Sequence, residues 1–241
     1  MKLAQVKLSA MVQYQVSQWL GPDGDDFMLP MEGIIYGEAD EEDPVKKIKL
    51  GDLKMYLVQV GNVINQEASL PFVLDRYQQI MDAGSALFND SFDDYSPWIQ
   101  HRYEEAFAGD NILLLDRLTL EPEVRGQRLG LAVLHRAILD WSSGCSFIVM
   151  KPFPLQYEGG KPNPKKVAEL RLEQFKASKA ESFRRLRNYY KRLGFERIGR
   201  SDIYARFAHD KMPTYEELSI PDGFTVSKAF FNDLAQRPEK K

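Results

Sequence analysis

The sequence predicts a mixed α/β protein, and three patterns lead to that prediction. Residues 113–141 pass from a strand-like apolar run through a short polar turn into a long amphipathic helix. Residues 188–199 have the pattern of a helix end, a glycine stop and a new strand. Residues 1–64 contain three strand-like segments, so strands and helices share one chain of 241 residues.

The N-terminal part predicts strands. Residues 3–18 alternate loosely between apolar and polar side chains, which is typical of a strand with one buried face. Segments 28–37 and 53–64 predict two more strands. The acidic run 38–43, followed by Pro44, lies between them and indicates a solvated turn.

The middle of the chain predicts two helices before the next strand. Pro71 suits the first turn of a helix, and apolar residues recur at helical spacing through 72–88. A looser helix is expected over 98–107, and the strand 112–120 follows. The order of three strands, two helices and a strand then leads into the turn that opens the next helix.

The C-terminal half alternates helices and strands. Helix 127–141 leads into strand 146–153, and a loop rich in proline and glycine follows. A long basic helix is predicted over 165–193. Strands at 195–199 and 203–207 come next, and a tail from Lys211 contains a short helix over 227–234.

Composition excludes several classes of protein. The net charge is −3, with one cysteine, Cys145, which rules out an intramolecular disulfide and a multi-cysteine zinc site. His101, His135 and His209 lack metal-ligand spacing, and His135 is expected on the surface of its helix. No membrane span or signal peptide is evident, so we expect a cytoplasmic protein with no membrane partner. A homodimer is left open.

The turn at Arg125-Gly126-Gln127-Arg128-Leu129-Gly130 predicts an anion site. The first backbone N–H groups of a helix have no partner within the helix, and the helix dipole adds partial positive charge there. Small residues let a phosphate approach the backbone, and the two arginines add side-chain charge. The sequence is therefore more informative about a phosphate-bearing cofactor than about what the protein modifies.

This turn resembles the acyl-CoA signature of the GNAT superfamily of N-acyltransferases, which reads Arg/Gln-x-x-Gly-x-Gly/Ala between a strand and a helix. Arg125 and Gly130 fit the pattern, whereas Arg128 stands where the first glycine is usual. A register shifted to 127–132 satisfies the pattern in full. The first register is preferred because the run Glu121-Pro122-Glu123-Val124 precedes Arg125 as a proline-containing turn precedes Arg-Gly in the family.

A second run, residues 188–196 (NYYKRLGFE), resembles the family's Tyr-x-x-Leu-Gly-Phe helix ending. The resemblance covers roughly 111–207. It implies a GNAT-like mixed, mostly antiparallel twisted sheet flanked by helices and splayed between two central parallel strands. We accordingly expect a β-rich part at 1–65 continuous with the main sheet, an acyltransferase core at 66–210 and a C-terminal tail at 211–241.

The resemblance also implies acetyl-CoA as cosubstrate and a set of residues that would hold it. The end of the signature strand would offer backbone groups to the thioester and pantetheine arm, and a β-bulge there would free their amides. The turn and the start of the helix would hold the pyrophosphate. The expected cofactor-binding residues are Leu118, Thr119, Leu120, Arg125, Gly126, Gln127, Arg128, Leu129, Gly130 and Leu131.

The catalytic candidates are Tyr190, Asp116 and Glu121. By resemblance Tyr190 lies near the sulfur, where its phenol would protonate the leaving thiolate, although packing alone would also explain it. Asp116 interrupts an apolar strand and is a candidate base or amine-binding group, or else a partner in an ion pair. Glu121 at the strand end is a further candidate base, and a water chain to solvent is an equal competitor.

These observations favour an N-acetyltransferase that acts on a primary amine of a small molecule or a protein. The alternative is a catalytically inactive acyl-CoA-binding sensor or interaction module, favoured by the missing first glycine. A third interpretation makes the basic segment 161–200 a nucleic-acid surface. The acidic overall charge and few interleaved aromatic residues disfavour it.

Overall fold

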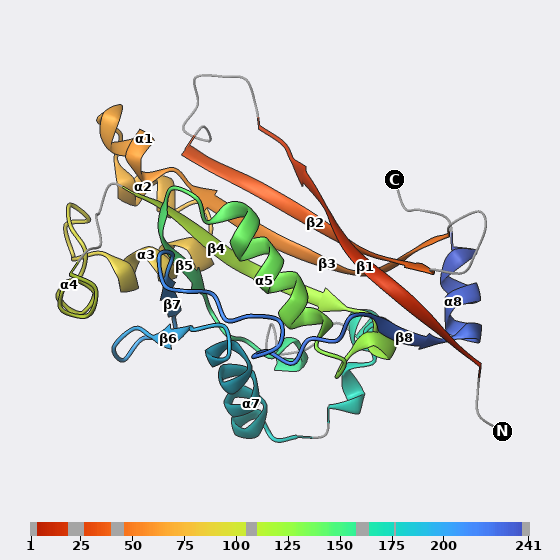
Figure 1. Ribbon diagram of the computed structural model, residues 1–241. Coiled ribbons are helices and arrows are strands. Elements are labelled where there is room, and N and C mark those ends of the chain that lie inside the picture. Colours follow the sequence, from red (N-terminus) through yellow and green to blue (C-terminus); the bar gives the residue numbers. More distant parts are fainter. Residues whose placement is uncertain are drawn as a thin grey trace.

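The computed structural model describes residues 4–18, 27–39, 46–104, 110–157, 164–175 and 177–237 (Figure 1). Its centre is a mixed sheet in which eight described strands follow the order β6-β7-β5-β4-β3-β2-β1-β8. The strands are β1 Gln5–Val16, β2 Met28–Ala39, β3 Lys47–Val58, β4 Asn111–Leu120, β5 Cys145–Met150, β6 Glu196–Arg197, β7 Tyr204–Phe207 and β8 Phe224–Ser227.

Helices flank this sheet. Figure 1 shows α5 crossing in front of the strands, whereas α1 to α4 gather at one end. The α-helices are α1 Val60–Asn65, α2 Leu70–Leu74, α3 Gln78–Leu87, α4 Pro97–Arg102, α5 Leu129–Trp141, α6 Pro164–Glu169, α7 Lys179–Lys191 and α8 Lys228–Ala235. Short 3₁₀ turns are η2 Pro122–Val124, η3 Leu155–Tyr157 and η4 Leu172–Gln174.

The pairing is antiparallel throughout except between β4 and β5, which run parallel. A parallel neighbour requires a crossover connection, and α5 provides it between these two strands. The strand predictions at 3–18, 28–37, 112–120, 146–153, 195–199 and 203–207 are confirmed with shifted ends, as are the helices at 127–141 and 227–234.

Side chains alternate across the sheet, and each face has its own apolar core. Leu113 and Leu115 of β4 pack in a cluster with α5, whereas Ile112 and Leu114 point into a second cluster with α1 to α4. All six residues of β5 are buried because both of its faces are covered. Cys145 lies fully buried in the first core, and burial raises the pKa of its thiol to about 12.

The predicted strand at 53–64 is wrong at both ends. Strand β3 begins at Lys47 and ends at Val58, and helix α1 follows from Val60. Val60 and Val63 are both buried. Their spacing of three residues places them on one helical face, so the apolar run continues through a change from strand to helix.

The single helix predicted over 72–88 is also wrong, since the chain forms α2 and α3 with a break between them. Tyr77 has extended backbone angles, φ −138° and ψ 132°, and its ring centroid lies 5.3 Å from that of Tyr56. Helix α2 packs against α3 where Gly84 lacks a side chain, because a Cβ there would lie 2.6 Å from Leu74 Cδ1. The looser helix expected at 98–107 is α4, and residues 105–107 lie outside the described residues.

The long basic helix predicted over 165–193 is three shorter elements, α6, η4 and α7. Arg171 adopts a left-handed conformation with φ +45°, which ends the first helical stretch, and Leu172 is buried just after it. The side chain of Ser178 caps α7 by accepting a hydrogen bond from the N–H of Glu181. Tertiary burial of Leu172 therefore interrupts a segment whose composition favours a continuous helix.

The sequence did not predict strand β8, which pairs with β1 from Gln5 to Leu8 at the edge of the sheet. The first two residues of the expected acidic turn, Glu38 and Ala39, belong to strand β2. Residues 40–45 lie outside the described residues. In the described part of the chain, no helix has the length and apolar character needed to cross a membrane.

Gly51 provides a test of the β3–β4 contact. A Cβ at this position would lie 2.1 Å from the carbonyl oxygen of Thr119, and the strand backbone cannot move away without losing its pairing. We expect Gly51→Ala to destabilise the protein by about 3 kcal/mol and to lower the unfolding midpoint by roughly 6–12 °C in calorimetry.

Gly144→Ala is the matched control for this substitution. Gly144 has φ +75°, but the nearest atom to an added Cβ is 4.0 Å away, so only backbone strain of about 1 kcal/mol is expected. Equal midpoints for the two variants would contradict the close approach of β3 and β4.

Candidate functional site

The site begins where β4 and β5 part. Their pairing ends at Leu115 and Met150, but β4 continues to Leu120 with β3 as its partner along that stretch. The register between β3 and β4 shifts at this point, and Asp116 is the extra residue that makes a β-bulge. We expected a bulge at residues 118–120, and the bulge instead lies before them, at Asp116. The separation opens the sheet on the side of β5.

The chain then turns into α5 through two left-handed residues. Gly126 has φ +80° and is exposed, and Arg128 has φ +67° as the residue before the first turn of α5. Glycine adopts this conformation at no cost, whereas a residue with a side chain is strained there by about 1 kcal/mol. Arg128 thus occupies a glycine-favouring position of the turn, where the GNAT motif usually has a glycine.

Backbone donors line this turn. Among the hydrogen bonds of the described residues, none uses the N–H groups of the five consecutive residues 126–130. The first bonded amides of α5 are those of Leu131 and Ala132, which both donate to Arg128 O. The unbonded amides and the helix dipole together favour an anion.

The two arginines of the turn are held by carbonyl groups. Arg125 donates from Nε and Nη2 to Leu120 O, at 2.9 and 2.7 Å, and its guanidinium lies over the ring of Phe175. Partial burial lowers the pKa of Arg125. Arg128 donates to Ser219 O at 2.5 Å. Both keep their positive charge beside the turn, because carbonyl acceptors carry none.

A first cavity of about 590 Å³ extends from this turn, within the size range of small-molecule sites. Its walls come from the end of β4, the turn, the start of α5, the η3 and η4 segments and α7. Most lining side chains are apolar. They include Leu118, Leu120, Val124, Leu129, Phe153, Leu155, Leu170, Leu172, Phe175 and Leu186.

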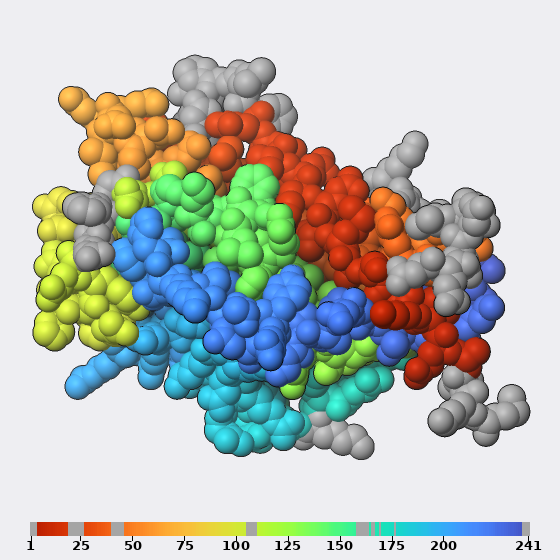
Figure 2. All heavy atoms as spheres, in the orientation of Figure 1, coloured from red at the N-terminus to blue at the C-terminus, as the bar shows by residue number. Residues whose placement is uncertain are grey.

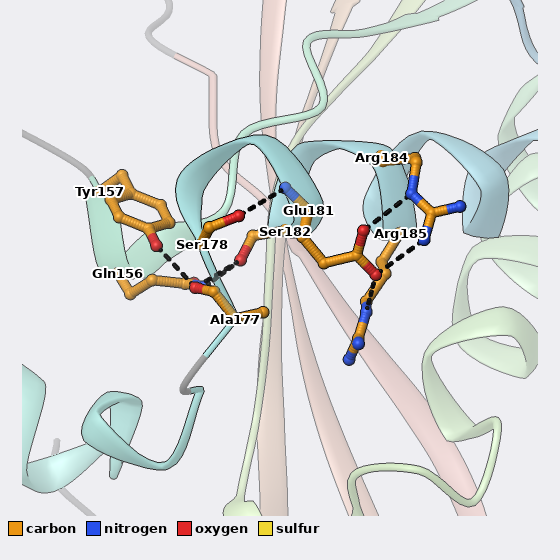
Figure 3. Close-up of polar contacts among 8 residues, drawn as sticks. All are labelled: Gln156, Tyr157, Ala177, Ser178, Glu181, Ser182, Arg184 and Arg185. Atoms are coloured by element: carbon orange, nitrogen blue, oxygen red, sulfur yellow. Dashed lines mark hydrogen bonds and ion pairs between the residues drawn. The ribbon is translucent and has the colours of Figure 1, made fainter.

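The α7 wall of this cavity is tied to the η3 turn (Figure 3). Tyr157 donates to Ala177 O at 2.9 Å, and Gln156 donates to the hydroxyl of Ser182 at 3.1 Å. Glu181, in the first turn of α7, pairs with Arg184 and Arg185, which lower the pKa of its carboxyl to about 2. Part of the basic charge expected on this helix is therefore neutralised within α7.

A second cavity of about 1010 Å³ is lined by residues of β3, β4 and α3, by the end of β5 and the residues after it, and by Leu134 of α5. It shares Leu118, Phe153, Leu155 and Tyr190 with the first cavity, so the two meet at the separation of β4 from β5. Its polar lining residues are Lys54, Gln78, Gln79, Asp82, Asp116, Arg117 and Lys151.

Tyr190 and Asp116 both line the second cavity. Burial raises the pKa of Tyr190 to about 12, so its phenol stays protonated at neutral pH. Glu121 is not among the described residues that line either cavity, although burial raises the pKa of its carboxyl. Its backbone N–H donates to Leu50 O at the end of the sheet.

The expected cofactor residues fall into two groups. Leu118, Thr119, Leu120, Arg125, Gly126, Arg128, Leu129 and Gly130 line the first cavity. Gln127 instead uses its side-chain amide to pair with the backbone of Thr225 in β8, donating at 2.7 Å and accepting at 2.8 Å. Leu131 is fully buried in the core, so its contribution is limited to its backbone.

Sequence reasoning missed the α3 wall of the second cavity and the lysines opposite it. Asp82, Lys54 and Lys151 lie far apart in the chain, and no local motif links them. Sequence reasoning also misplaced His135, which is buried, with Nε2 2.9 Å from Pro213 O. No cluster of potential metal ligands occurs within the described ranges.

Residues 208–223 close this side of the molecule. Figure 2 shows this segment in blue, crossing the surface between α5 in green and α7 in cyan. The carbonyl of Leu218 accepts a hydrogen bond from Arg192 at the end of α7, and that of Ser219 accepts one from Arg128. The segment therefore links the two helices that flank the first cavity.

Comparison of the chain with protein-family models, with curated proteins and with solved structures finds no match.

Gly130 allows a test of the first cavity. A Cβ on Gly130 would lie 2.5 Å from the hydroxyl of Tyr189 and 3.2 Å from Leu118 Cδ2, so Gly130→Ala must displace the tyrosine. We expect a loss of about 1–3 kcal/mol in the free energy of unfolding, measured by urea denaturation.

The double variant Gly130→Ala/Tyr189→Phe separates this contact from the general cost of changing a helical residue. Removing the hydroxyl removes the nearest atom, so the double variant should regain most of the stability relative to Tyr189→Phe alone. A double-mutant cycle with no coupling would contradict the packing of Tyr189 on Gly130.

Proposed function

We propose that the protein is an acyl-CoA-dependent N-acetyltransferase of the GNAT type, which transfers the acetyl group of acetyl-CoA directly to a primary amine of a small molecule or a protein. The observation that carries the proposal is the pair of adjoining cavities at the separation of β4 from β5. One begins at unbonded backbone amides and is largely apolar, and the other is polar and contains ionisable groups.

The first cavity suits the cosubstrate by its chemistry. The N–H groups of residues 126–130 and the nearby guanidinium groups favour a pyrophosphate, and the apolar walls favour the pantetheine arm. The exposed turn at Gly126 gives a phosphate open access, since an added Cβ would meet nothing within 4 Å. Leu118, Thr119 and Leu120 lead from this turn toward the second cavity.

The groups at the junction can manage the protons of an acyl transfer. The amine nitrogen forms a bond to the acetyl carbon as the carbon–sulfur bond breaks, and the amine loses one proton to Asp116 or to solvent. Tyr190 gives its phenolic proton to the thiolate and regains one from solvent, so atoms and charges balance. Asp116 is a better candidate than Glu121 because it lines the same cavity as Tyr190.

A catalytically inactive acyl-CoA-binding sensor or interaction module is the second candidate. The observation that favours it is the state of the arginines, since Arg125 and Arg128 both donate to carbonyls of their own chain. Such a module would keep the cofactor cavity and need no proton donor.

The first experiment measures coenzyme A binding. We expect calorimetry to detect binding of coenzyme A and of acetyl-CoA. The thermal unfolding midpoint of the protein should rise with the concentration of either ligand. Thiol release from acetyl-CoA in the presence of an amine panel then distinguishes the two candidates, because stabilisation with no turnover on any amine supports the binding module. A folded protein that binds neither acetyl-CoA nor coenzyme A would overturn both candidate functions.

The second experiment tests Tyr190. We expect Tyr190→Phe to lower kcat by about 100-fold or more while the affinity for coenzyme A stays within a few-fold. Because the raised pKa of Tyr190 keeps the phenol protonated, the loss in kcat should keep the same order of magnitude between pH 6 and pH 9.

Tyr215→Phe serves as the control for Tyr190→Phe, because Tyr215 is exposed and packs on His135 outside both cavities. It should retain the turnover of the unmodified protein. An unchanged kcat in Tyr190→Phe across this pH range would remove Tyr190 as proton donor.

A further inference from the structure

The outer edge of β1 is open along most of the strand. Strand β8 pairs with this edge from Gln5 to Leu8, and β2 pairs with the other edge as far as Val16. In the part of the chain that the structure describes, no strand pairs with the outer edge from Ala10 to Val16. Figure 2 shows β1 in red on the surface of the molecule. Alternate residues of this stretch direct their backbone N–H and C=O groups outward, where another strand can pair with them.

The open stretch has none of the features that usually protect an exposed edge. Residues 10–16 (AMVQYQV) contain no charged residue, proline or glycine, and their pairing with β2 is regular, without a bulge. The opposite edge of the sheet is protected, because β6 consists of Glu196 and Arg197 alone and Glu196 pairs with Arg102 at 3.1 Å. The edge of β1 is long and uncharged, and such an edge pairs readily with another strand.

The side chains of the open stretch are exposed at its two ends and anchored in between. Met11 is 39% exposed and Val16 is 43% exposed. Val12 and Tyr14 pack against the apolar core that includes α5, and the ring of Tyr14 meets that of Trp141 edge-on, with centroids 5.4 Å apart. Because the strand is already held by the core and by β2, little conformational freedom is lost when a further strand binds to it.

The open stretch is complementary to a second copy of itself. In an antiparallel pair centred on Gln13, opposite residues both have even numbers or both have odd numbers, so they lie on the same face and the inner faces of the two sheets join. Every residue then meets an uncharged residue, and a β-branched side chain beside an aromatic ring is a favourable cross-strand pair. The opposing residues are Ala10 with Val16, Met11 with Gln15, Val12 with Tyr14, and Gln13 with its own counterpart.

We propose that two copies of this chain associate edge to edge through residues 10–16 of β1, about a two-fold axis at Gln13. The sheet of one copy then continues into the sheet of the other. Because both copies use the same surface, the association closes as a dimer and does not extend into a filament. None of the described residues that line the two cavities belongs to β1, so this inference goes beyond the proposed acyl transfer and does not depend on it.

The first measurement is the mass of the full chain in solution. Sedimentation velocity should give a dimer, twice the 27.7 kDa of one chain, with a dissociation constant on the order of micromolar or below. Gln13 is exposed, so a charge placed there leaves the core unchanged, but in the dimer it faces an equal charge. We expect Gln13→Glu and Gln13→Lys each to raise the dissociation constant by about tenfold or more, since like charges directly opposite repel.

An equimolar mixture of the two variants should restore the dimer, because a carboxylate then lies opposite an ammonium group at the axis. Gln5→Glu is the matched control. Gln5 lies in the same strand and is exposed like Gln13, but β8 covers its edge. This variant should keep the dissociation constant of the unmodified protein, and circular dichroism of each variant verifies that it is folded.

The proposal fails if the unmodified chain is monomeric at about 100 μM, well above a micromolar dissociation constant, or if it forms an oligomer other than a dimer. It also fails if neither charge at Gln13 weakens the dimer, because the contact then lies on another surface. Variants that dissociate alone and stay monomeric when mixed would exclude the two-fold register centred on Gln13 and overturn the proposal as well.

Discussion

The end of the β4–β5 pairing at Leu115 and Met150 is the constraint on which the rest of the site depends. Up to that pair, β4 is held on both edges and packs between two apolar cores. Beyond it, β4 is held by β3, and the bulge at Asp116 turns the strand away from β5. The opening exposes backbone and side chains of residues 116–120 between the two faces of the sheet. Without this separation, the two cavities would share no wall.

The two cavities differ in chemistry because most of their walls come from different elements. In the first cavity, a helix start, a left-handed turn and apolar side chains such as Phe153, Leu172 and Phe175 surround a space suited to a phosphate-bearing chain. In the second cavity, β3, β4, α3 and the residue after β5 contribute charged groups, of which Lys151 and Asp82 pair with each other. A reaction that joins an apolar thioester arm to a polar amine would suit such a junction, since the apolar and the charged cavity share one wall.

Local signals predicted the parts of the structure that depend on short segments. The strand 111–120, the turn at Gly126, helix α5 and the stop at Gly194, with φ +85°, all follow from nearby residues. The break between α2 and α3 depends on the approach of Leu74 to Gly84, and the break before Leu172 depends on its burial. Strand β8 depends on the free edge of β1. The second cavity likewise joins β3, α3 and the residue after β5, and only the folded chain brings them together.

The departure of Arg128 from the glycine of the motif is explained by a contact distant in sequence. Its left-handed backbone costs about 1 kcal/mol more than that of glycine. The carbonyl of Ser219 offsets this cost by accepting from its guanidinium, and the nearby Gln127 side chain pairs with Thr225. A glycine would need no such support, but it would also leave residues 218–225 without these two links to the turn. The geometry of the turn and the position of the C-terminal segment are therefore coupled, and a change in either one alters the N–H groups available to an anion.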